Sequence, residues 1–549
     1  MSTQQGEAMP MTERAEQDTP RRAMSFGRFL FEILVVAALL TGGMYLYRNH
    51  IMTREKKLSL FIEGRNTLKR NDLVSLNRAE KSLTAVLDLD RDDPAAVSAL
   101  AELNFWKAMH GLPTLDKAKA FADEADRINA ERSDRFATRA YLKIVEGKAP
   151  EAETELRALL ERDIAAPKLA HALGWALMEQ GRYDEANRII TQAKEADFSN
   201  LAMSLTLAEM AERRGKERTA VSHLRGIIKD SMNPNHAWAR GWLAALLAKN
   251  YGSLTEPARH IQELRQRVEE AKSAPDTYAM SPRAMAMLEW AEGELALAMG
   301  NADGARAKAA EAQKLAPNYP PIMTLTARAD LAQKKVKEGI AAYEAAAREG
   351  AQYRGIRWAL AEAKSRDLDD GALAIVDELE KTNVEAKGPE YEIFRGEHDL
   401  RKGNIEEAKN AFTRAAELGN DPAILFGLAK VTFEEEKKKG NKADLERVGE
   451  AFQRTIDRRS TYPEAHEYMA EISLWNYAME AADQSFKTAE AQYKRVNAPI
   501  GELVAFYDRT IAAFGAANGP RPAKKQASEL QAAWTARKQS YIDTILNEG

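Results

Sequence analysis

The fold is decided by residues 168–198, which read KLAHALGWALMEQGRYDEANRIITQAKEADF. Gly174 and Ala186 lie 12 residues apart, so two of the smallest side chains fall where two antiparallel helices approach each other most closely. Ile190 continues the apolar side of the second helix at helical spacing. Gly181, followed by a polar residue, is a helix stop between the two. The stretch therefore predicts two helices joined by a tight turn.

The same spacing returns along most of the chain. Small side chains, with one valine among them, recur at steps of 34 residues in the series Ala118, Ala152, Ala186 and Ala220 and in the pairs Ala305 with Gly339 and Val448 with Ala482. A period of 34 residues is typical of helix-turn-helix solenoids, in which each repeat packs on its neighbours. We expect about twelve repeats between Leu58 and Val496.

At residues 168–198 the chain resembles the tetratricopeptide repeat (TPR) family. The match is carried by the large and small residues Leu173, Gly174, Tyr183, Ala186, Ile190 and Ala193. The resemblance implies an all-α fold: a right-handed superhelical solenoid of TPR-like helix-turn-helix repeats, whose concave face binds peptide segments or helices of other proteins. One subclass binds a partner's terminal carboxylate with Lys and Asn on the concave helices. The corresponding positions here, such as His171 and Trp175, do not match, so binding of that type is not expected.

We expect four segments along the chain. They are a disordered polar tail at 1–24, a transmembrane helix at 25–48, a TPR-like solenoid at 49–496 and C-terminal capping helices at 497–549. The tail is rich in Gln, Thr, Glu and Pro, a composition that buries too little apolar surface to fold. The cap is expected because the last helix carries a one-sided stripe and a solenoid end needs an atypical element over its open face. A partner-binding helix is the alternative for that segment.

Composition favours one long helical array and narrows the possible partners. The 549 residues are 45% hydrophobic and rich in Ala, Leu, Glu, Lys and Arg, which favours helices over disorder. A formal net charge of -4 and a pI near 6.2 give no basic field for nucleic acid, so we expect none to bind. The chain has no cysteine, which excludes disulfides, thiolate metal sites and a cysteine nucleophile.

Residues 29–47, FLFEILVVAALLTGGMYLY, are apolar over about the length that a helix needs to cross a bilayer. We expect a transmembrane anchor. The alternative is a cleaved secretory signal, because basic residues precede the apolar run. Against cleavage, the run is longer than a usual signal core and lacks a small-residue exit. Basic residues flank both sides equally, so they give no orientation. A short polar tail before a first apolar segment is typical of a signal anchor, which favours an exported solenoid.

The sequence carries no catalytic or cofactor motif, so we expect neither enzyme activity nor a cofactor. No glycine-rich phosphate loop follows a strand-like run. The histidines are scattered, and His466 with Glu467 begins a zinc-helix pattern that has Ala470 where the second histidine is needed. We therefore expect no metal site.

Partner-binding residues are expected at inward positions of the first helices of the repeats. By analogy with the family geometry these positions are Phe105, Trp106, His171, Trp175, Trp290, Glu294, Phe426, Lys430, Glu467, Glu471 and Trp475. Exposed aromatic side chains are common anchors of protein interfaces. The competing interpretation of each ring is packing between neighbouring repeats. Glu464, Glu467 and Glu471 also form an acidic stripe at helical spacing that suits a basic partner segment, with plain solvation as the alternative.

Two functions fit an anchored solenoid of this kind. The first is a membrane-anchored protein-interaction scaffold that helps assemble or stabilise an envelope complex, with the anchor in a bacterial inner membrane and the solenoid in the periplasm. The second is a cytoplasm-facing, membrane-tethered adaptor or holdase-like quality-control factor. An enzyme would need chemistry hidden in the irregular segment 251–280.

Overall fold

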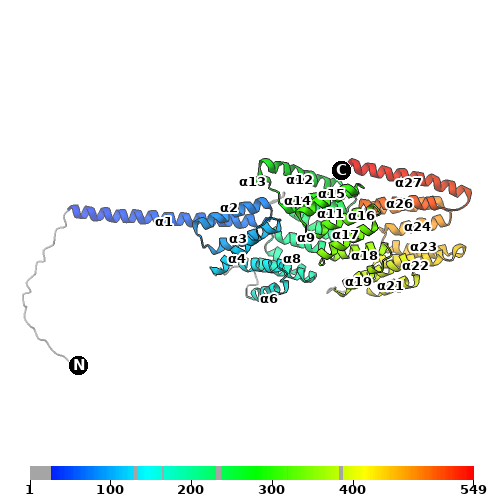
Figure 1. Cartoon of the computed structure of the whole chain (residues 1–549), viewed down its shortest axis with the longest axis horizontal. Helices are drawn as coiled ribbons and strands as arrows, with labels where there is room; N and C mark the ends of the chain where they lie inside the picture. Colours follow the sequence, from blue (N-terminus) through cyan, green and yellow to red (C-terminus); the bar gives the residue numbers. More distant parts are fainter. Residues whose placement is uncertain are drawn as a thin grey trace, which may run out of the picture. The chain divides into compact units, whose positions relative to one another are not determined.

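The computed structural model describes residues 26–128, 133–162, 166–229, 236–317, 319–382 and 388–548. Within these ranges the chain forms 27 α-helices, one short 3-10 helix and no strand (Figure 1). The expected all-α class is therefore confirmed. The chain divides into two compact units, Met1–Ser59 and Leu60–Gly549. The tail predicted at 1–24 lies outside the described residues.

Helix α1 (Phe26–Leu68) is one continuous helix that contains the apolar segment. Its span Leu30–Leu68 is long and apolar enough to cross a membrane, and the mean hydropathy of its apolar window is 1.8. None of that window is buried within the protein. The hydroxyl of Thr41 donates to the carbonyl of Ala37, so this polar group is satisfied inside the helix, as an apolar environment requires.

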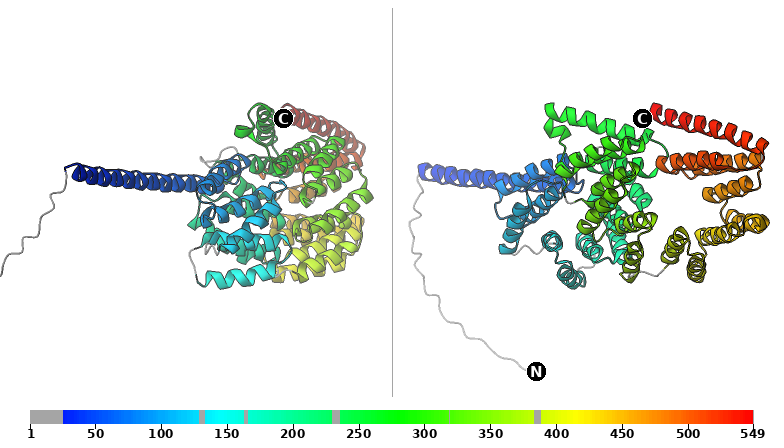
Figure 2. Two further views of the ribbon diagram at one scale, coloured as in Figure 1. Left: turned by 60° about the vertical axis from the view of Figure 1, so that its left-hand side comes forward. Right: turned by 45° about the vertical axis from the view of Figure 1, so that its right-hand side comes forward.

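The second unit is built from helices that pack as consecutive hairpins. The C-terminal end of α1 packs on α2 (Leu73–Leu89), because a Cβ added at Gly64 would lie 2.7 Å from the Cγ of Leu83. In the described ranges, hairpins then follow in chain order: α3 (Pro94–Met109) with α4 (Leu115–Arg127), α5 (Ser133–Val145) with α6 (Ala149–Leu160), α7 (Pro167–Glu179) with α8 (Tyr183–Ala196), α9 (Leu201–Arg213) with α10 (Glu217–Lys229), α11 (Ala237–Asn250) with α12 (Thr255–Ser273), α14 (Pro282–Ala298) with α15 (Ala302–Leu315), α16 (Pro320–Ala332) with α17 (Val336–Glu349), α18 (Arg354–Arg366) with α19 (Gly371–Lys381), α20 (Glu390–Lys402) with α21 (Ile405–Leu418), α22 (Pro422–Lys437) with α23 (Leu445–Arg458), and α24 (Pro463–Trp475) with α25 (Met479–Arg495). A last hairpin is formed by α26 (Ile500–Ala516) with α27 (Arg521–Glu548), and the remaining elements are α13 (Pro275–Tyr278) and the 3-10 helix η1 (Gly440–Lys442). The right-hand view of Figure 2 shows the hairpins stacked in chain order, so the TPR-like solenoid is confirmed.

The stretch that decides the fold forms the hairpin of α7 and α8, as predicted. A Cβ added at Gly174 would lie 2.2 Å from the Cγ1 of Ile190, so the two helices meet where the sequence placed two small residues. Ala186 and Ile190 are fully buried at this crossing. Gly181 has a φ of +75°, the left-handed conformation in which glycine ends a helix without a Cβ clash.

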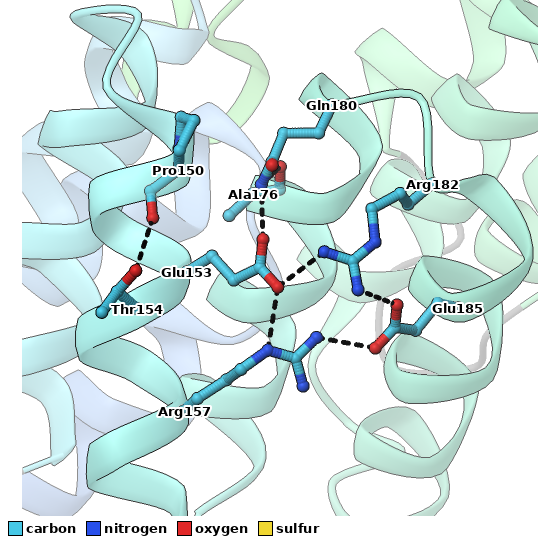
Figure 3. A network of polar contacts seen from close by, with 8 residues as sticks. All are labelled: Pro150, Glu153, Thr154, Arg157, Ala176, Gln180, Arg182 and Glu185. Atoms are coloured by element: carbon cyan, nitrogen blue, oxygen red, sulfur yellow. Dashed lines mark hydrogen bonds and ion pairs between the residues drawn. The ribbon is translucent and has the colours of Figure 1, made fainter. Parts of the chain in front are cut away.

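Neighbouring hairpins are connected by polar side chains in addition to apolar packing (Figure 3). The carboxylate of Glu153 on α6 accepts hydrogen bonds from Arg157, Gln180 and Arg182. The carboxylate of Glu185 on α8 accepts from both arginines. The network thus joins α6 of one hairpin to α8 of the next. Its side chains are partly exposed, so we expect it to fix the relative position of the hairpins more than to stabilise the fold.

The array changes its spacing after α11. The partner helix α12 is 19 residues long, and the four-residue α13 follows it. As a result α11 packs directly on α14. A Cβ added at Gly241 would lie 2.8 Å from the Cβ of Met287 and 3.2 Å from the backbone nitrogen of Leu288, so only glycine allows the two backbones to approach this closely.

Segments far apart in sequence touch within the second unit. The backbone N–H of Leu201 donates to the carbonyl of Lys69 at 2.9 Å, and that of Arg283 donates to the carbonyl of His110 at 3.0 Å. The hydroxyl of Tyr183 donates to the carbonyl of Gln352 at 2.7 Å. Successive turns of the superhelix are therefore in contact, and they narrow the space inside the array.

The end of the chain packs back on the middle of the array. Trp534 on α27 is buried, and its indole N–H donates to Asp483 at 2.9 Å. Ile545 is buried against Leu254 and Ile500, which brings the end of α27 to the start of α12 (Figure 1). The last helix thus buries its apolar stripe against the solenoid.

Candidate functional site

A groove of about 790 Å³ lies between α22, α24 and α26, the first helices of consecutive hairpins. We call it the C-terminal groove. It is lined by Phe433, Lys437, Gly440, Glu471, Leu474, Trp475, Tyr477, Arg509, Ala512, Ala513, Ala516, Ala517 and Asn518. Two of the residues predicted from the sequence, Glu471 and Trp475, are among them.

The C-terminal groove exists because small side chains face large ones across it. At the end of α26 and just after it, the run IAAFGAA, residues 511–517, places alanines along the groove, and Ala512 and Ala516 are exposed. On the other side the rings of Phe433 and Trp475 lie edge to face with their centroids 5.8 Å apart. The alanines leave open the space that a larger side chain would fill. The groove therefore has an apolar surface suited to an apolar side chain from outside.

The charges at the rim of the groove are unevenly paired. Arg509 donates to the carboxylate of Glu467 at 2.8 and 2.9 Å, and Lys437 lies 3.4 Å from the carboxylate of Glu434. Glu471 is exposed and makes no ion pair with any residue in the described part of the chain. The rim therefore has a single carboxylate whose charge is not matched by a bonded cation.

The predicted acidic stripe is divided by the structure. Glu467 is 7% exposed, and besides Arg509 its carboxylate accepts a hydrogen bond from the hydroxyl of Tyr493. Glu464, one turn away, is half-buried, and burial raises the pKa of its carboxyl. Glu471 is the exposed member of the stripe, and partial burial with the nearby charge of Glu467 raises the pKa of its carboxyl as well. A basic partner side chain would therefore reach Glu471 first.

A second cavity, of about 600 Å³, lies inside the N-terminal turns of the second unit. We call it the N-terminal lumen. It is lined by Trp106, Met109, Ile144, Val145, Gly147, Trp175, Glu179, Ala202, Leu205, Thr206, Glu209, Arg213, Trp238, Arg283, Tyr319, Pro320, Gln352 and Tyr353. These residues come from first helices of successive hairpins, from the turn after α5, from the start of α16 and from the segments just before α16 and α18. The lumen includes Trp106 and Trp175, which the sequence predicted at inward positions.

Phe105, Trp106, His171 and Trp175 form one buried aromatic cluster with Tyr141. Phe105 stacks on Tyr141 at 5.1 Å, and Trp106 stacks on both His171 and Trp175 at 6.1 and 6.0 Å. All four predicted residues are less than 9% exposed. These rings pack between neighbouring repeats, which was the competing interpretation of their positions.

His171 is held neutral inside this cluster. Its Nδ1 is 2.8 Å from the hydroxyl of Tyr141, and its Nε2 is 2.8 Å from the hydroxyl of Thr206. Complete burial, with a smaller effect of the nearby Lys168, lowers the pKa of His171 to about 3. Both ring nitrogens therefore have partners within the protein, and the ring is a packing element there.

The other predicted residues are also engaged within the array. The indole of Trp290 donates to Glu294 at 2.9 Å, and Arg328 forms an ion pair with the same carboxylate at 2.7 Å. Phe426 is buried, with the ammonium of Lys430 lying 4.9 Å from its ring centroid. Lys430 itself pairs with Glu397.

Sequence reasoning missed three features of these two sites. Ala512 and Ala516 were not singled out. The run of alanines on α26 is nevertheless a signal, because small side chains on one helix face allow either a close helix contact or an open groove. Arg509 and Arg283 were not singled out either. No local pattern marks them, because their neighbours come from other hairpins.

No protein-family model matches the chain, and no curated protein matches it. Among solved structures, similarity is found to Cut9 in a Cut9–Hcn1 hetero-tetramer of the APC/C, at 13% identity and a TM-score of 0.38, covering 89% of this chain and 98% of that one. Yeast Tom70 has 14% identity and a TM-score of 0.34, with coverage of 88% and 97%. A human IFIT1 dimer with PPP-AAAA has 16% identity and a TM-score of 0.37, with coverage of 72% and 90%. The TPR-like description of this chain rests on its own hairpins and their 34-residue spacing.

Proposed function

We propose that the protein is a membrane-anchored interaction scaffold that binds partner proteins in the C-terminal groove. The observation that carries the proposal is the open apolar groove between α22, α24 and α26 with the unpaired carboxylate of Glu471 at its rim. The occupant we propose is a partner segment that places an apolar side chain against Trp475 and a Lys or Arg beside Glu471. Such a segment buries apolar surface and supplies the missing positive charge in one contact.

We infer that the apolar part of α1 tethers the solenoid to a membrane. The apolar helix of residues 29–47 has the length and composition of a membrane-spanning signal anchor. We therefore propose that the solenoid is exported into a bacterial periplasm, where the scaffold helps assemble or stabilise an envelope complex. The alternative is a cytoplasm-facing adaptor or holdase-like factor, which the equal basic flanks of the helix also allow.

Peptide selection tests the binding mode. Full-length protein in nanodiscs is panned against a library of displayed random peptides, and bound peptides are then measured by fluorescence anisotropy. We expect enrichment of peptides with an apolar residue near a Lys or Arg, and a loss of affinity of about 30-fold with Trp475→Ala. Glu471→Arg should turn the preference towards acidic peptides.

A matched charge reversal controls for the net charge of the protein. Glu450 on α23 is exposed and lies outside the groove lining, so Glu450→Arg should leave the selected peptides and their affinities unchanged. Selection of peptides that bind Trp475→Ala as well as the wild type would reject the groove as the binding site.

A topology reporter fused after Gly549 tests the orientation. Activity of a periplasmic reporter, with a cytoplasmic reporter inactive at the same position, is expected for the exported scaffold. The reverse result would exclude the periplasmic scaffold and favour the cytoplasm-facing adaptor.

A further inference from the structure

The N-terminal lumen has the size and surface of a small-molecule site. Its volume of about 600 Å³ falls in the range of roughly 300–1,000 Å³ that is usual for ligand pockets. Aromatic rings line much of it, including Trp106, Trp175 and Trp238. It is separate from the C-terminal groove, with which it shares no lining residue.

The carboxylates that line the lumen already have partners. Glu179 lies 2.9 Å from a guanidinium nitrogen of Arg213 and accepts a hydrogen bond from the indole of Trp175 at 3.0 Å. Glu209 accepts from the same arginine at 2.6 Å. The guanidinium of Arg213 is therefore occupied by two acids, and it offers little attraction to a further anion.

Aromatic rings lie beside the guanidinium of Arg283, whereas that of Arg213 is paired with two carboxylates. Its guanidinium carbon lies 4.4 Å from the ring centroid of Tyr319 and 5.6 Å from that of Trp238. Its Nε is buried without a hydrogen-bond acceptor, and no carboxylate in the described residues forms an ion pair with it. The backbone N–H of Arg283 donates to the carbonyl of His110, and this bond holds the start of α14 in place.

An arginine side chain keeps its charge at any ordinary pH. Stacking on two aromatic rings compensates that charge only in part, and it leaves the edge of the guanidinium, with its N–H donors, without an anion. The edge is where carboxylates bind arginine with two parallel hydrogen bonds. The lumen therefore combines an apolar aromatic enclosure with one uncompensated cation.

We propose that the N-terminal lumen binds a small organic monocarboxylate, with its carboxylate on Arg283 and its apolar body among the tryptophans. A single negative charge matches the single unmatched cation. A doubly charged phosphate would meet Glu179 and Glu209 without a second cation to balance it. An aromatic acid and a medium-chain fatty acid share the required chemistry, and the experiment distinguishes them.

The test uses full-length protein in nanodiscs and three probes. They are 1-naphthoate, the neutral isostere 1-naphthamide and octanoate, with empty nanodiscs subtracted. Binding is followed by isothermal titration calorimetry and by quenching of tryptophan fluorescence. We expect 1-naphthoate or octanoate to bind about 10- to 100-fold more tightly than 1-naphthamide, since a charged hydrogen bond is lost with the amide. The tighter of the two acids identifies the apolar body.

Two variants assign the effect to Arg283. Arg283→Met keeps an unbranched apolar side chain between the rings and removes the charge, so acid binding should fall to the level of the amide. Arg218, whose guanidinium lies 5.7 Å from the ring centroid of Tyr251 outside the lumen, is the matched control, and Arg218→Met should bind the acids like the wild type.

Three outcomes would overturn the proposal: no acid binds the wild type, the amide binds it as tightly as the acids, or Arg283→Met retains full acid binding. Because the comparison of acid with amide is made on the wild type, the proposal stays falsifiable even if Arg283→Met does not fold.

Discussion

Gly174→Ala tests the helix crossing on which the repeat is built. An alanine in a helix is normally about 1 kcal/mol more stable than a glycine. At this position, however, the added Cβ would lie 2.2 Å from the Cγ1 and 2.8 Å from the Cδ1 of Ile190, which is fully buried and β-branched. Ordinary carbon contacts are about 3.5–4.0 Å, so the helices must separate by more than an ångström. We place the overpacking near 3 kcal/mol, the upper end of its usual range, which leaves a net loss of about 2 kcal/mol.

Gly226→Ala should have the opposite effect on stability in the same array. Gly226 lies within α10, is exposed, and has no atom within 4 Å of an added Cβ. Only the helix preference operates there, so the variant should be stabilised by about 1 kcal/mol. Hydrogen exchange followed by mass spectrometry measures the two sites locally, which suits an array that need not unfold in one step.

Exchange of the α7–α8 amides should be about 30-fold faster in Gly174→Ala, and exchange of the α10 amides about fivefold slower in Gly226→Ala. If exchange of the α7–α8 amides instead slows in Gly174→Ala, as that of the α10 amides does in Gly226→Ala, then α7 and α8 do not cross closely at Gly174.

Three further predictions concern buried charges. Burial raises the pKa of Glu212 from 4.5 to about 8, so the folded state keeps a proton that the unfolded chain releases. The free energy of unfolding should therefore fall by about 1.4 kcal/mol per pH unit as the pH rises from 5 to 8. Glu212→Gln should remove this part of the pH dependence in urea melts. The pKa of His171 is lowered from 6.5 to about 3, so its contribution is lost as the pH falls below 6.5, and His171→Gln should lose less stability between pH 7 and 5 than the wild type. Lys168 forms ion pairs with the buried carboxylates of Glu102 and Asp134. Lys168→Met leaves the carboxylate of Glu102 without its ion-pair partner, whereas Asp134 keeps its pair with Arg65. The variant should cost about 3–5 kcal/mol in the same melts, and adding Glu102→Gln should restore part of the loss.

Local features of the repeat were predictable from the sequence. The small size of Gly174 and Ala186 and the backbone freedom of Gly181 determine their structural roles. The contacts that they make lie within one hairpin. Helix pairing follows from the same local pattern. The prediction of a helix, a turn and a second helix at residues 168–198 therefore needed no knowledge of the rest of the chain.

Contacts between successive turns of the superhelix were not predictable in this way. Whether Tyr183 meets Gln352, or Leu201 meets Lys69, depends on a small rotation per hairpin that adds up over several repeats. These contacts narrow the inside of the array, and Trp106 and Trp175 pack there instead of facing an open concave surface. The inward positions were placed from the family geometry, but their exposure depends on the sum of the rotations.

The C-terminal groove, unlike the inside of the N-terminal turns, is open, because three consecutive first helices leave space between them. Trp475 and Glu471 were expected at inward positions by analogy with the family geometry, whereas the alanines of α26 that open the groove lie in the segment expected to form a cap. A cap and a groove wall are compatible, since α26 packs on α24 and α25 with one face and lines the groove with another.

Photo-crosslinking from inside the groove tests the central claim most directly. A benzophenone amino acid at Ala516, which is exposed in the groove, is compared with one at Gln484, which is exposed on α25 outside it. In cells, the Ala516 probe should give a discrete adduct that disappears with Trp475→Ala and is competed in membranes by a peptide selected on the wild type. Equal adduct formation from Gln484, or an adduct at Ala516 that persists with both Trp475→Ala and the competing peptide, would contradict partner binding in the groove.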